Sequence, residues 1–453
     1  MYVLIILFST ICTYVGGIVI SKSKIRMNES YKSRIVLLGT IIINLGLLIY
    51  FKYSNFLIGC LNFIALKFRI NVTIPNVDVL LPVGISFYIF QALGYAIDIY
   101  RGEIEPEYNF FKYALFVSFF PQLVAGPIER SKRLLPQINK IYNKKIQLSN
   151  IYHGVLYIVW GLFLKMVIAD RISILVDNVF DNYYIYGGVE LIVAAISFAI
   201  QIYCDFYGYS TVAVGTAEIL GIDLVSNFQA PYLSMSIKEF WRRWHISLSN
   251  WFKDYLYIPL GGNRCTTIRK YINIITVFLV SGLWHGAAIT YVIWGGLHGI
   301  YQVLGDVLKP VQNKIQGIFK INRECFSYRL GCIMGTFVLT DLAWIFFRAP
   351  GVSIALSYIK RIFVDFDPWI FSNGGLFELG IDRVDMNILI CAIGILIISD
   401  ILLYYKNITI VDFVVSQNYV FQYVCICFVV AFILIFGAYG SGFDEKAFVY
   451  FQF

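Results

Sequence analysis

The sequence predicts an all-α protein that crosses a membrane many times. Hydrophobic residues make up 59% of the 453 positions and charged residues only 14%, whereas a soluble domain carries about 25% charged residues. Mean hydropathy is +0.71, and apolar runs long enough to span a bilayer, roughly 17–25 residues each, recur along the chain. A closed β-barrel would show short alternating segments instead, so the runs indicate helices.

The apolar runs suggest about 10–12 transmembrane helices, because the longest runs have room for two. The first run is expected to be a retained helix and not a signal peptide, since basic residues follow it and none precedes it. A single integral membrane domain over 1–453 is predicted. The runs are 2–20, 35–67, 79–99, 110–127, 151–176, 189–208, 271–305, 331–347, 387–405 and 419–438.

Charge asymmetry between the loops predicts the orientation. Basic residues dominate 22–34, 129–145 and 309–329, and acidic residues dominate 365–385. Basic loops stay in the cytoplasm, so both termini are expected outside. The abundance of isoleucine, tyrosine, lysine and phenylalanine suggests a bacterium, so the expected membrane is a bacterial plasma membrane. The positive charge is thus explained by orientation and contact with membrane lipids, and no nucleic-acid partner is expected. Three acidic residues at 103–107 do not fit the alternation and suggest a re-entrant segment nearby.

One amphipathic stretch, residues 238–264, stands out among the loops. Ser236 followed by Glu239 resembles a capping box, which predicts a helix beginning near residue 237. Aromatic residues at this spacing are typical of a helix at the cytoplasmic membrane interface, with Arg242 and Arg243 reaching toward headgroups. The stripe consists of Trp241, Trp244, Leu248, Trp251 and Tyr255.

Histidines are the strongest candidates for chemistry. His285 lies in a stretch without charge between Lys270 and Asp306, and an ionisable group in such a place indicates function by default. Its neighbours Gly282 and Gly286 leave room for a substrate or another backbone. A neutral imidazole here suits a general base that deprotonates an attacking hydroxyl, and the alternative is a bond across helices.

Other candidates are weaker. His298 follows thirteen residues later, which on one continuous helix is about 20 Å of rise and a different face, so a structural role is expected for it. His245 needs a partner or water if it is buried. His153 ends a basic loop. The scattered cysteines have no spacing typical of a metal site, so no metal is predicted.

Two long blocks carry a family resemblance. "KEFWRRWHISLSNWFKDYLYIPLGGNR" (238–264) and "SGLWHGAAITYVIWGGLHG" (281–299) resemble the membrane-bound O-acyltransferase (MBOAT) family, in its bacterial branch of alginate, peptidoglycan and cellulose O-acetylation proteins. "FPQLVAGPIER" (120–130) and "QIYCDFYGYSTVAVGTAEILGI" (201–222) are similar to the same branch. The resemblance covers a core of about 80–350.

The resemblance implies the MBOAT fold and a membrane O-acyltransferase. His285 falls on the family histidine of the "WHG" block and His245 on that of the "WHIS" block, which implies catalytic roles for both. An acyl group, most simply acetyl, would pass from a cytoplasmic thioester, acetyl-CoA or an acyl carrier, to a cell-surface polysaccharide. No tightly bound cofactor is implied. We expect Trp241, Trp244, Arg242 and Arg243 to form the donor-side mouth, with the arginines facing an anionic donor.

The last residues, "FVYFQF", fit the pattern F-x-Y-x-x-F through Phe448, Tyr450 and Phe453. Similar endings occur in relatives of this branch, where the tyrosine accepts the acyl group. The resemblance implies an extracellular tail, about 440–453, and a membrane-anchored, esterase-like partner of the SGNH type that completes the transfer. An aromatic membrane anchor is the simpler alternative for this ending.

Two alternatives stay open at this stage. D-alanyl transfer to teichoic acid by a related family member is permitted by the same motifs. A transporter would line a pathway with its intramembrane polar groups, but transporters often show repeats in matching halves, and this sequence has no such symmetry.

Overall fold

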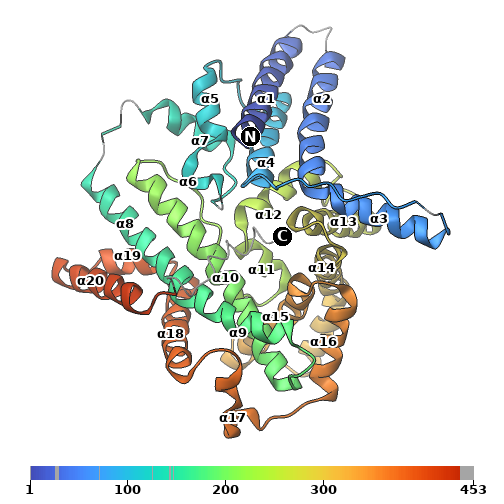
Figure 1. Ribbon diagram of the computed structural model, residues 1–453. Helices are drawn as coiled ribbons and strands as arrows, with labels where there is room; N and C mark the ends of the chain where they lie inside the picture. Colours follow the sequence, from blue (N-terminus) through green and yellow to red (C-terminus); the bar gives the residue numbers. More distant parts are fainter. Residues whose placement is uncertain are drawn as a thin grey trace. The chain divides into compact units, whose positions relative to one another are not determined.

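The computed structural model describes residues 2–25, 30–70, 72–124, 126–141, 144–145 and 147–438, and every regular element in these ranges is a helix (Figure 1). The contacts divide the chain into two compact units. Unit 1 comprises Met1–Ile151, Thr216–Val225 and Gly286–Ala288, and unit 2 comprises Tyr152–Gly215, Ser226–His285 and Ile289–Phe453. Each unit is described by itself below.

Unit 1 is built around α1, α2 and α4, which pack against one another. Small and amide side chains bond where the helices meet: Ser9 donates to Asn44 at 2.5 Å, and Tyr113 donates to Thr13 at 2.7 Å. The elements are α1 (Tyr2–Ile25), α2 (Ser30–Leu48), the π-helix η1 (Ile49–Tyr53), α3 (Ser54–Lys67), α4 (Ile85–Arg101), α5 (Phe110–Val117), α6 (Phe120–Leu123) and α7 (Ser131–Asn139).

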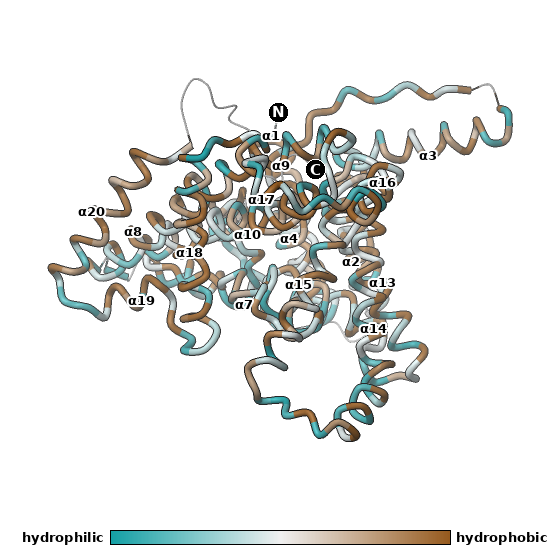
Figure 2. The backbone as a smooth tube through the Cα atoms, turned by 90° about the horizontal axis from the view of Figure 1, so that it is seen from below, coloured by the Kyte–Doolittle hydropathy of each residue, from teal (hydrophilic) through white to brown (hydrophobic). Residues whose placement is uncertain are grey.

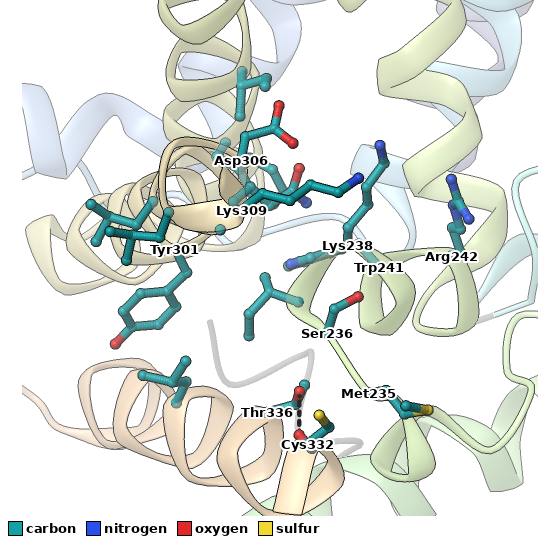
Figure 3. Close-up of a pocket in the computed structure, with 18 of the residues that line it drawn as sticks. Met235, Ser236, Lys238, Trp241, Arg242, Tyr301, Asp306, Lys309, Cys332 and Thr336 are labelled. Atoms are coloured by element: carbon teal, nitrogen blue, oxygen red, sulfur yellow. Dashed lines mark hydrogen bonds between the residues drawn. The ribbon is translucent and has the colours of Figure 1, made fainter. Parts of the chain in front are cut away.

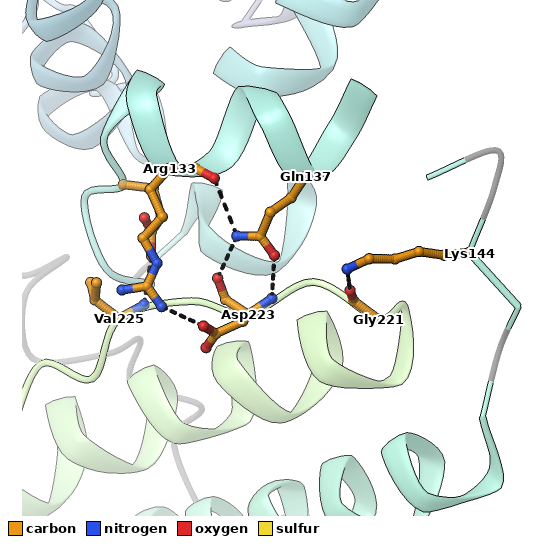
Figure 4. A network of polar contacts seen from close by, with 7 residues as sticks. Arg133, Gln137, Lys144, Gly221, Asp223 and Val225 are labelled. Atoms are coloured by element: carbon orange, nitrogen blue, oxygen red, sulfur yellow. Dashed lines mark hydrogen bonds and ion pairs between the residues drawn. The ribbon is translucent and has the colours of Figure 1, made fainter. Parts of the chain in front are cut away.

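Side chains of α7 and Lys144 in unit 1 contact residues 221–225 (Figure 4). Arg133 pairs with the Asp223 carboxylate at 2.7 Å. The Gln137 amide bonds both main-chain groups of Asp223, at 2.9 Å each, and the Lys144 ammonium donates to the Gly221 carbonyl. Arg133 and Lys144, two of the basic residues that predicted the orientation in the membrane, therefore also bind the segment 221–225.

Unit 2 contains the longer helices and both sequence blocks that resemble the acyltransferases. Its elements are α8 (Leu148–Leu162, whose first turn counts with unit 1), η3 (Phe163–Ala169), α9 (Asp170–Asp181), α10 (Gly188–Ile219, whose last turn counts with unit 1), η4 (Pro231–Leu233), α11 (Ile237–Arg243), α12 (Ile246–Phe252), η5 (Lys253–Tyr257), α13 (Thr267–His285), α14 (Ile289–Ile318), α15 (Phe326–Arg348), α16 (Val352–Val364), α17 (Ile370–Asn373), η6 (Gly375–Glu378), α18 (Arg383–Lys406), α19 (Ile410–Val415) and α20 (Tyr419–Phe436).

Seven helical stretches of the described residues are long and apolar enough to cross a membrane: Tyr2–Lys24, Tyr31–Lys67, Leu148–Asp181, Gly188–Ile219, Phe326–Arg348, Arg383–Lys406 and Tyr419–Phe436. Figure 2 shows that most residues of α18 and α20 are hydrophobic. The predicted all-α membrane architecture is confirmed. The predicted count of about 10–12 rested on apolar runs, and three of those runs are not among the seven spans. Run 79–99 folds as α4, run 110–127 as α5 and α6, and run 271–305 as α13 and α14.

Several charged groups within the helices of unit 2 are paired. The Lys165 ammonium lies 2.7 Å from Asp170 and 2.6 Å from Asp205, whose side chain is 1% exposed. Arg171 pairs with Asp385 at 3.1 Å. Gly161 and Gly208 let α8 and α10 approach closely beside Lys165, because a Cβ on Gly208 would lie 2.7 Å from the Gly161 carbonyl. Pairing offsets part of the cost of placing charge in an apolar bundle.

Candidate active site

His245 sits at a break between two short helices. The sequence predicted one continuous helix from residue 237, and that prediction is wrong: α11 ends at Arg243, and His245 adopts a left-handed conformation (φ 43°, ψ 54°) before α12 begins. Neighbouring backbone causes the break, since Ile246 N–H donates to the Asn227 carbonyl at 3.0 Å and Gln229 N–H donates to the Arg243 carbonyl at 3.0 Å. These tertiary bonds replace the helical ones and turn the His245 side chain away from the α11 stripe.

The start of α11 agrees with the sequence. Ser236 Oγ accepts a hydrogen bond from Glu239 N–H at 3.2 Å, as a capping residue should. The Glu239 carboxylate accepts from Met235 N–H at 2.9 Å, one residue before the position that a capping box requires. The predicted helix start is confirmed, with a variant of the predicted bond.

His285 ends α13 in a tight helical hairpin. The chain reverses after His285, and α14 runs back along α13. Glycines allow the contact: a Cβ on Gly282 would lie 2.3 Å from the Tyr291 carbonyl, and one on Gly295 would lie 2.2 Å from the Phe278 carbonyl. The prediction that Gly282 admits another backbone is confirmed. The assumption of one continuous helix through His285 and His298 is wrong.

His245 and His285 are neighbours within a cluster of aromatic side chains, the aromatic cage. The ring centroids of His245 and His285 lie 6.3 Å apart, and the exposed fractions of the two residues are 0% and 2%. Trp284 and Trp294 each lie 4.9 Å from the His285 ring, and Phe347 lies 5.7 Å from it. The cage brings together α12, α13, α14 and α15, and it excludes water from both imidazoles.

Burial also sets the protonation of His245, which lies outside the candidate membrane spans. Loss of hydration lowers the pKa of His245 from 6.5 to about 3, because the charged imidazolium is disfavoured there. His245 is therefore neutral at neutral pH, which is the form that accepts a proton.

His298 takes part in the same aromatic cluster through Trp241. Trp241 Nε1–H donates to His298 Nδ1 at 3.2 Å, so Nε2 carries the proton of the neutral ring. The His298 ring lies 5.1 Å from Trp294, which also contacts His285. The geometry is that of a residue that holds Trp241 in place.

Trp241 and Trp244 of the amphipathic stretch 238–264 are buried in protein. Trp244 is 0% exposed and Trp241 is 8% exposed; Trp244 packs 5.1 Å from Trp344 and 5.0 Å from Phe228 between ring centroids. The expectation that both anchor at the membrane interface is therefore wrong. Lipid anchoring needs an exposed ring, and here neighbouring aromatic rings take the place of headgroups.

The adjacent arginines point to different surroundings. Arg243 pairs with Glu239 at 3.0 Å, donates to the Gln229 carbonyl at 3.1 Å and lies 4.3 Å from the Tyr404 ring centroid. Arg242 instead lines a large pocket. The structure therefore places Arg242, but not Arg243, in the lining of this pocket.

That pocket, of about 1850 Å³, lies between α11–α12, α13, α14 and α15 (Figure 3). Trp241, Ile246 and Ser281 belong to its lining, and Ile246 and Ser281 are respectively next to His245 and one turn before His285. Among the described residues that line it, the only acid is Asp306, which pairs with Lys270. The basic ones are Lys238, Arg242, Lys253, Lys270, Lys309 and Arg323.

Sequence reasoning missed three cage residues, Trp294, Trp344 and Phe347. They come from α14 and α15, far along the chain from His245. The rarity of tryptophan in the sequence hinted at Trp294 and Trp344, and it gave no signal for Phe347. The tail residues Phe448, Tyr450 and Phe453 lie outside the described residues.

Comparison with known proteins identifies the family. Residues 101–338 match the model of the membrane-bound O-acyltransferase family. A probable alginate O-acetylase of Pseudomonas putida is 37% identical over 80% of this chain and 71% of its own length. The peptidoglycan O-acetyltransferase of Helicobacter pylori is 36% identical over 73% of this chain and 65% of its own length. The teichoic acid D-alanyltransferase of Streptococcus thermophilus is 32% identical over 49% of this chain and 56% of its own length.

The chain thus spans about two thirds of the length of the O-acetylases that it matches. Its family match includes the cage histidines, the pocket and the hairpin of α13 and α14. The chain belongs to the membrane-bound O-acyltransferase family and is a multi-pass membrane O-acyltransferase.

Proposed function

We propose that this protein transfers an acetyl group from a cytoplasmic thioester across the membrane, for O-acetylation of a cell-surface polysaccharide. The observation that carries the proposal is the pair of buried histidines, whose ring centroids lie 6.3 Å apart. They are close in the chain to Ile246 and Ser281, which line a basic pocket. Acetyl is favoured over D-alanyl because the O-acetylase relatives match 73–80% of the chain, against 49% for the D-alanyltransferase.

In this proposal His285 is the general base. It takes the proton of an acceptor hydroxyl as the oxygen attacks the thioester carbonyl, and the proton then goes to the leaving thiolate. His245 assists as a neutral neighbour. The aromatic cage keeps water from competing as the acceptor, which would otherwise hydrolyse the thioester.

The basic pocket receives the donor in this proposal. Acetyl-CoA and an acyl-carrier thioester both carry phosphate, and Lys238, Arg242 and Lys309 contribute cationic groups to the lining of the pocket. A charge-assisted bond contributes about 1.5–3 kcal/mol, so Arg242→Ala is expected to raise the donor KM roughly tenfold or more. Arg269→Ala is the matched control, because Arg269 is not among the pocket-lining residues. Equal KM values for the two variants would remove Arg242 from the donor site.

The acceptor side involves the C-terminal tail. In this proposal both termini lie outside, Tyr450 receives the acetyl group, with Phe448 and Phe453 flanking it, and a membrane-anchored SGNH-type transferase passes the group on to the polymer. The expected intermediate is an acetyl-tyrosine ester detectable by mass spectrometry of the C-terminal peptide. Full transfer by Tyr450→Phe would refute the relay and leave the histidine mechanism intact.

The main test measures ester-linked acid released by mild alkali from purified surface polymer. Cells carry the wild type, His285→Ala or the control His153→Ala, at matched membrane levels. The proposal expects loss of the ester in His285→Ala alone, and the released acid identifies the acyl group. An unchanged ester in His285→Ala would contradict a catalytic role for this residue.

A further inference from the structure

Unit 1 contains a helical run that is too long for one upright crossing. The stretch Tyr31–Lys67 has 37 residues, which at 1.5 Å per residue is about 55 Å, whereas the hydrocarbon core is about 30 Å thick. The π-helix η1 (Ile49–Tyr53) interrupts the run between α2 and α3. π-bulges are frequent causes of a bend, and Figure 1 shows α3 leaving α2 at a wide angle.

Beyond the bend, α3 has an apolar surface that the unit does not cover. None of its residues is buried, and Phe63, Leu66 and the following Phe68 are 70–79% exposed. Leaving side chains of this size in water forgoes roughly 1.5–3 kcal/mol each relative to burial. An environment other than bulk water is therefore expected around α3.

Several backbone groups of this region pair within it. Two asparagines of α3, seven residues apart, each hold one residue of the extended chain that runs back beside the helix (Figure 2). Asn62 accepts from Ile74 N–H at 2.8 Å and donates to the Ile74 carbonyl at 2.9 Å. Asn55 does the same for Val77, at 2.8 and 3.1 Å. Internal pairing of backbone groups is what an environment poor in water demands.

We propose that α3 and the chain clamped to it, residues 54–70 and 72–78, form an arm that lies in the plane of the bilayer at the boundary of headgroups and acyl chains. Its partner is lipid, in the leaflet that the end of α2 reaches. The apolar surface of the arm continues the exposed apolar surface of α2, where Ile42 is 67% exposed. Lys67 and Arg69, at the tip, can reach the headgroups from that depth.

Native cysteines allow a direct test in the full-length protein. A variant that keeps only Cys60, exposed on α3, is labelled with an environment-sensitive fluorophore and placed in phosphatidylcholine vesicles. The vesicles carry a nitroxide in the headgroup, near the top of the acyl chain or near its end. Two controls keep only Cys391, exposed in the candidate span α18, or only Cys325, in the polar loop before α15.

The expected result is that Cys60 is quenched most by the nitroxide near the top of the chain, about twofold more than by the one near its end. Quenching of Cys60 by a water-soluble quencher at the level of Cys325 would overturn the proposal, since the arm would then stand in water for a protein to cover. A depth equal to that of Cys391 would also overturn it, because the arm would then cross the membrane.

A second measurement does not depend on labelling. In vesicles, trypsin is expected to cut the wild type slowly at Lys67 and Arg69, and Asn55→Ala/Asn62→Ala several times faster, because the released chain can leave the surface. Equal cutting of the two proteins at these sites would refute the role of the asparagine clamps in holding the arm on lipid.

Discussion

Replacing one glycine of the α13–α14 hairpin tests whether the site depends on the exact spacing of these helices. A Cβ at position 295 would lie 2.2 Å from the Phe278 carbonyl oxygen of α13. An ordinary contact between carbon and oxygen is about 3.3 Å, so Gly295→Ala forces the helices apart by about 1 Å. His285 ends α13, and its ring lies 4.9 Å from that of Trp294, the residue before the substitution.

A displacement of 1 Å at a reacting group can cost about a hundredfold in rate, equivalent to about 2.7 kcal/mol. Gly295→Ala is therefore expected to lower transfer about a hundredfold. Gly296→Ala is the control, because its Cβ would meet only the Leu279 side chain, at 3.4 Å, while both changes raise helix propensity equally. The assay is thioester consumption by purified protein in nanodiscs, after near-ultraviolet circular dichroism has shown both variants folded. Transfer by Gly295→Ala within threefold of the control would refute the reasoning.

Three further predictions concern stability. Arg243→Ala should lower the free energy of unfolding by about 1–3 kcal/mol and, unlike Arg242→Ala, leave the donor KM unchanged, as chemical denaturation and kinetics would reveal. Lys165→Met should cost about 3–5 kcal/mol, because it leaves the Asp205 carboxylate without its cation; a smaller loss in the double variant Lys165→Met/Asp205→Asn than in Lys165→Met checks that cause. Since burial lowers the pKa of His245 from 6.5 to about 3, the unfolded chain takes up a proton below pH 6.5 that the folded chain refuses. The free energy of unfolding should then decrease as the pH is lowered in that range, by at most about 1.4 kcal/mol per pH unit. His245→Asn should make the melting temperature depend less on pH between pH 7 and pH 5.

The membrane class and the helical fold were predictable from sequence, and His285 could be selected from it as a candidate catalytic residue. Long apolar runs leave helices as the simplest solution, and His285 stood out because no charged residue lies between Lys270 and Asp306. The start of α11 was predictable too, since capping depends on residues three apart. In each of these cases the signal lies within one segment.

Features set by distant segments could not be predicted. The break at His245 arises from bonds to Asn227 and Gln229, so the aromatic period of residues 241–255 pointed to a continuous helix. The separate roles of Arg242 and Arg243 depend on Tyr404 of α18, which lies far along the chain. Nor does spacing indicate that Phe347 of α15 packs beside His285 of α13, or that Trp344 packs against Trp244.

The aromatic cage gives the chain its own optical probe. Trp241, Trp244, Trp284, Trp294 and Trp344, five of the eight tryptophans, lie in the cluster around the histidines. The rings of Trp294 and Trp344 are stacked, with centroids 5.4 Å apart and planes at 23°, close enough for their excited states to couple. Intrinsic fluorescence and near-ultraviolet dichroism therefore report chiefly on the site, and donor binding can be titrated in unlabelled protein.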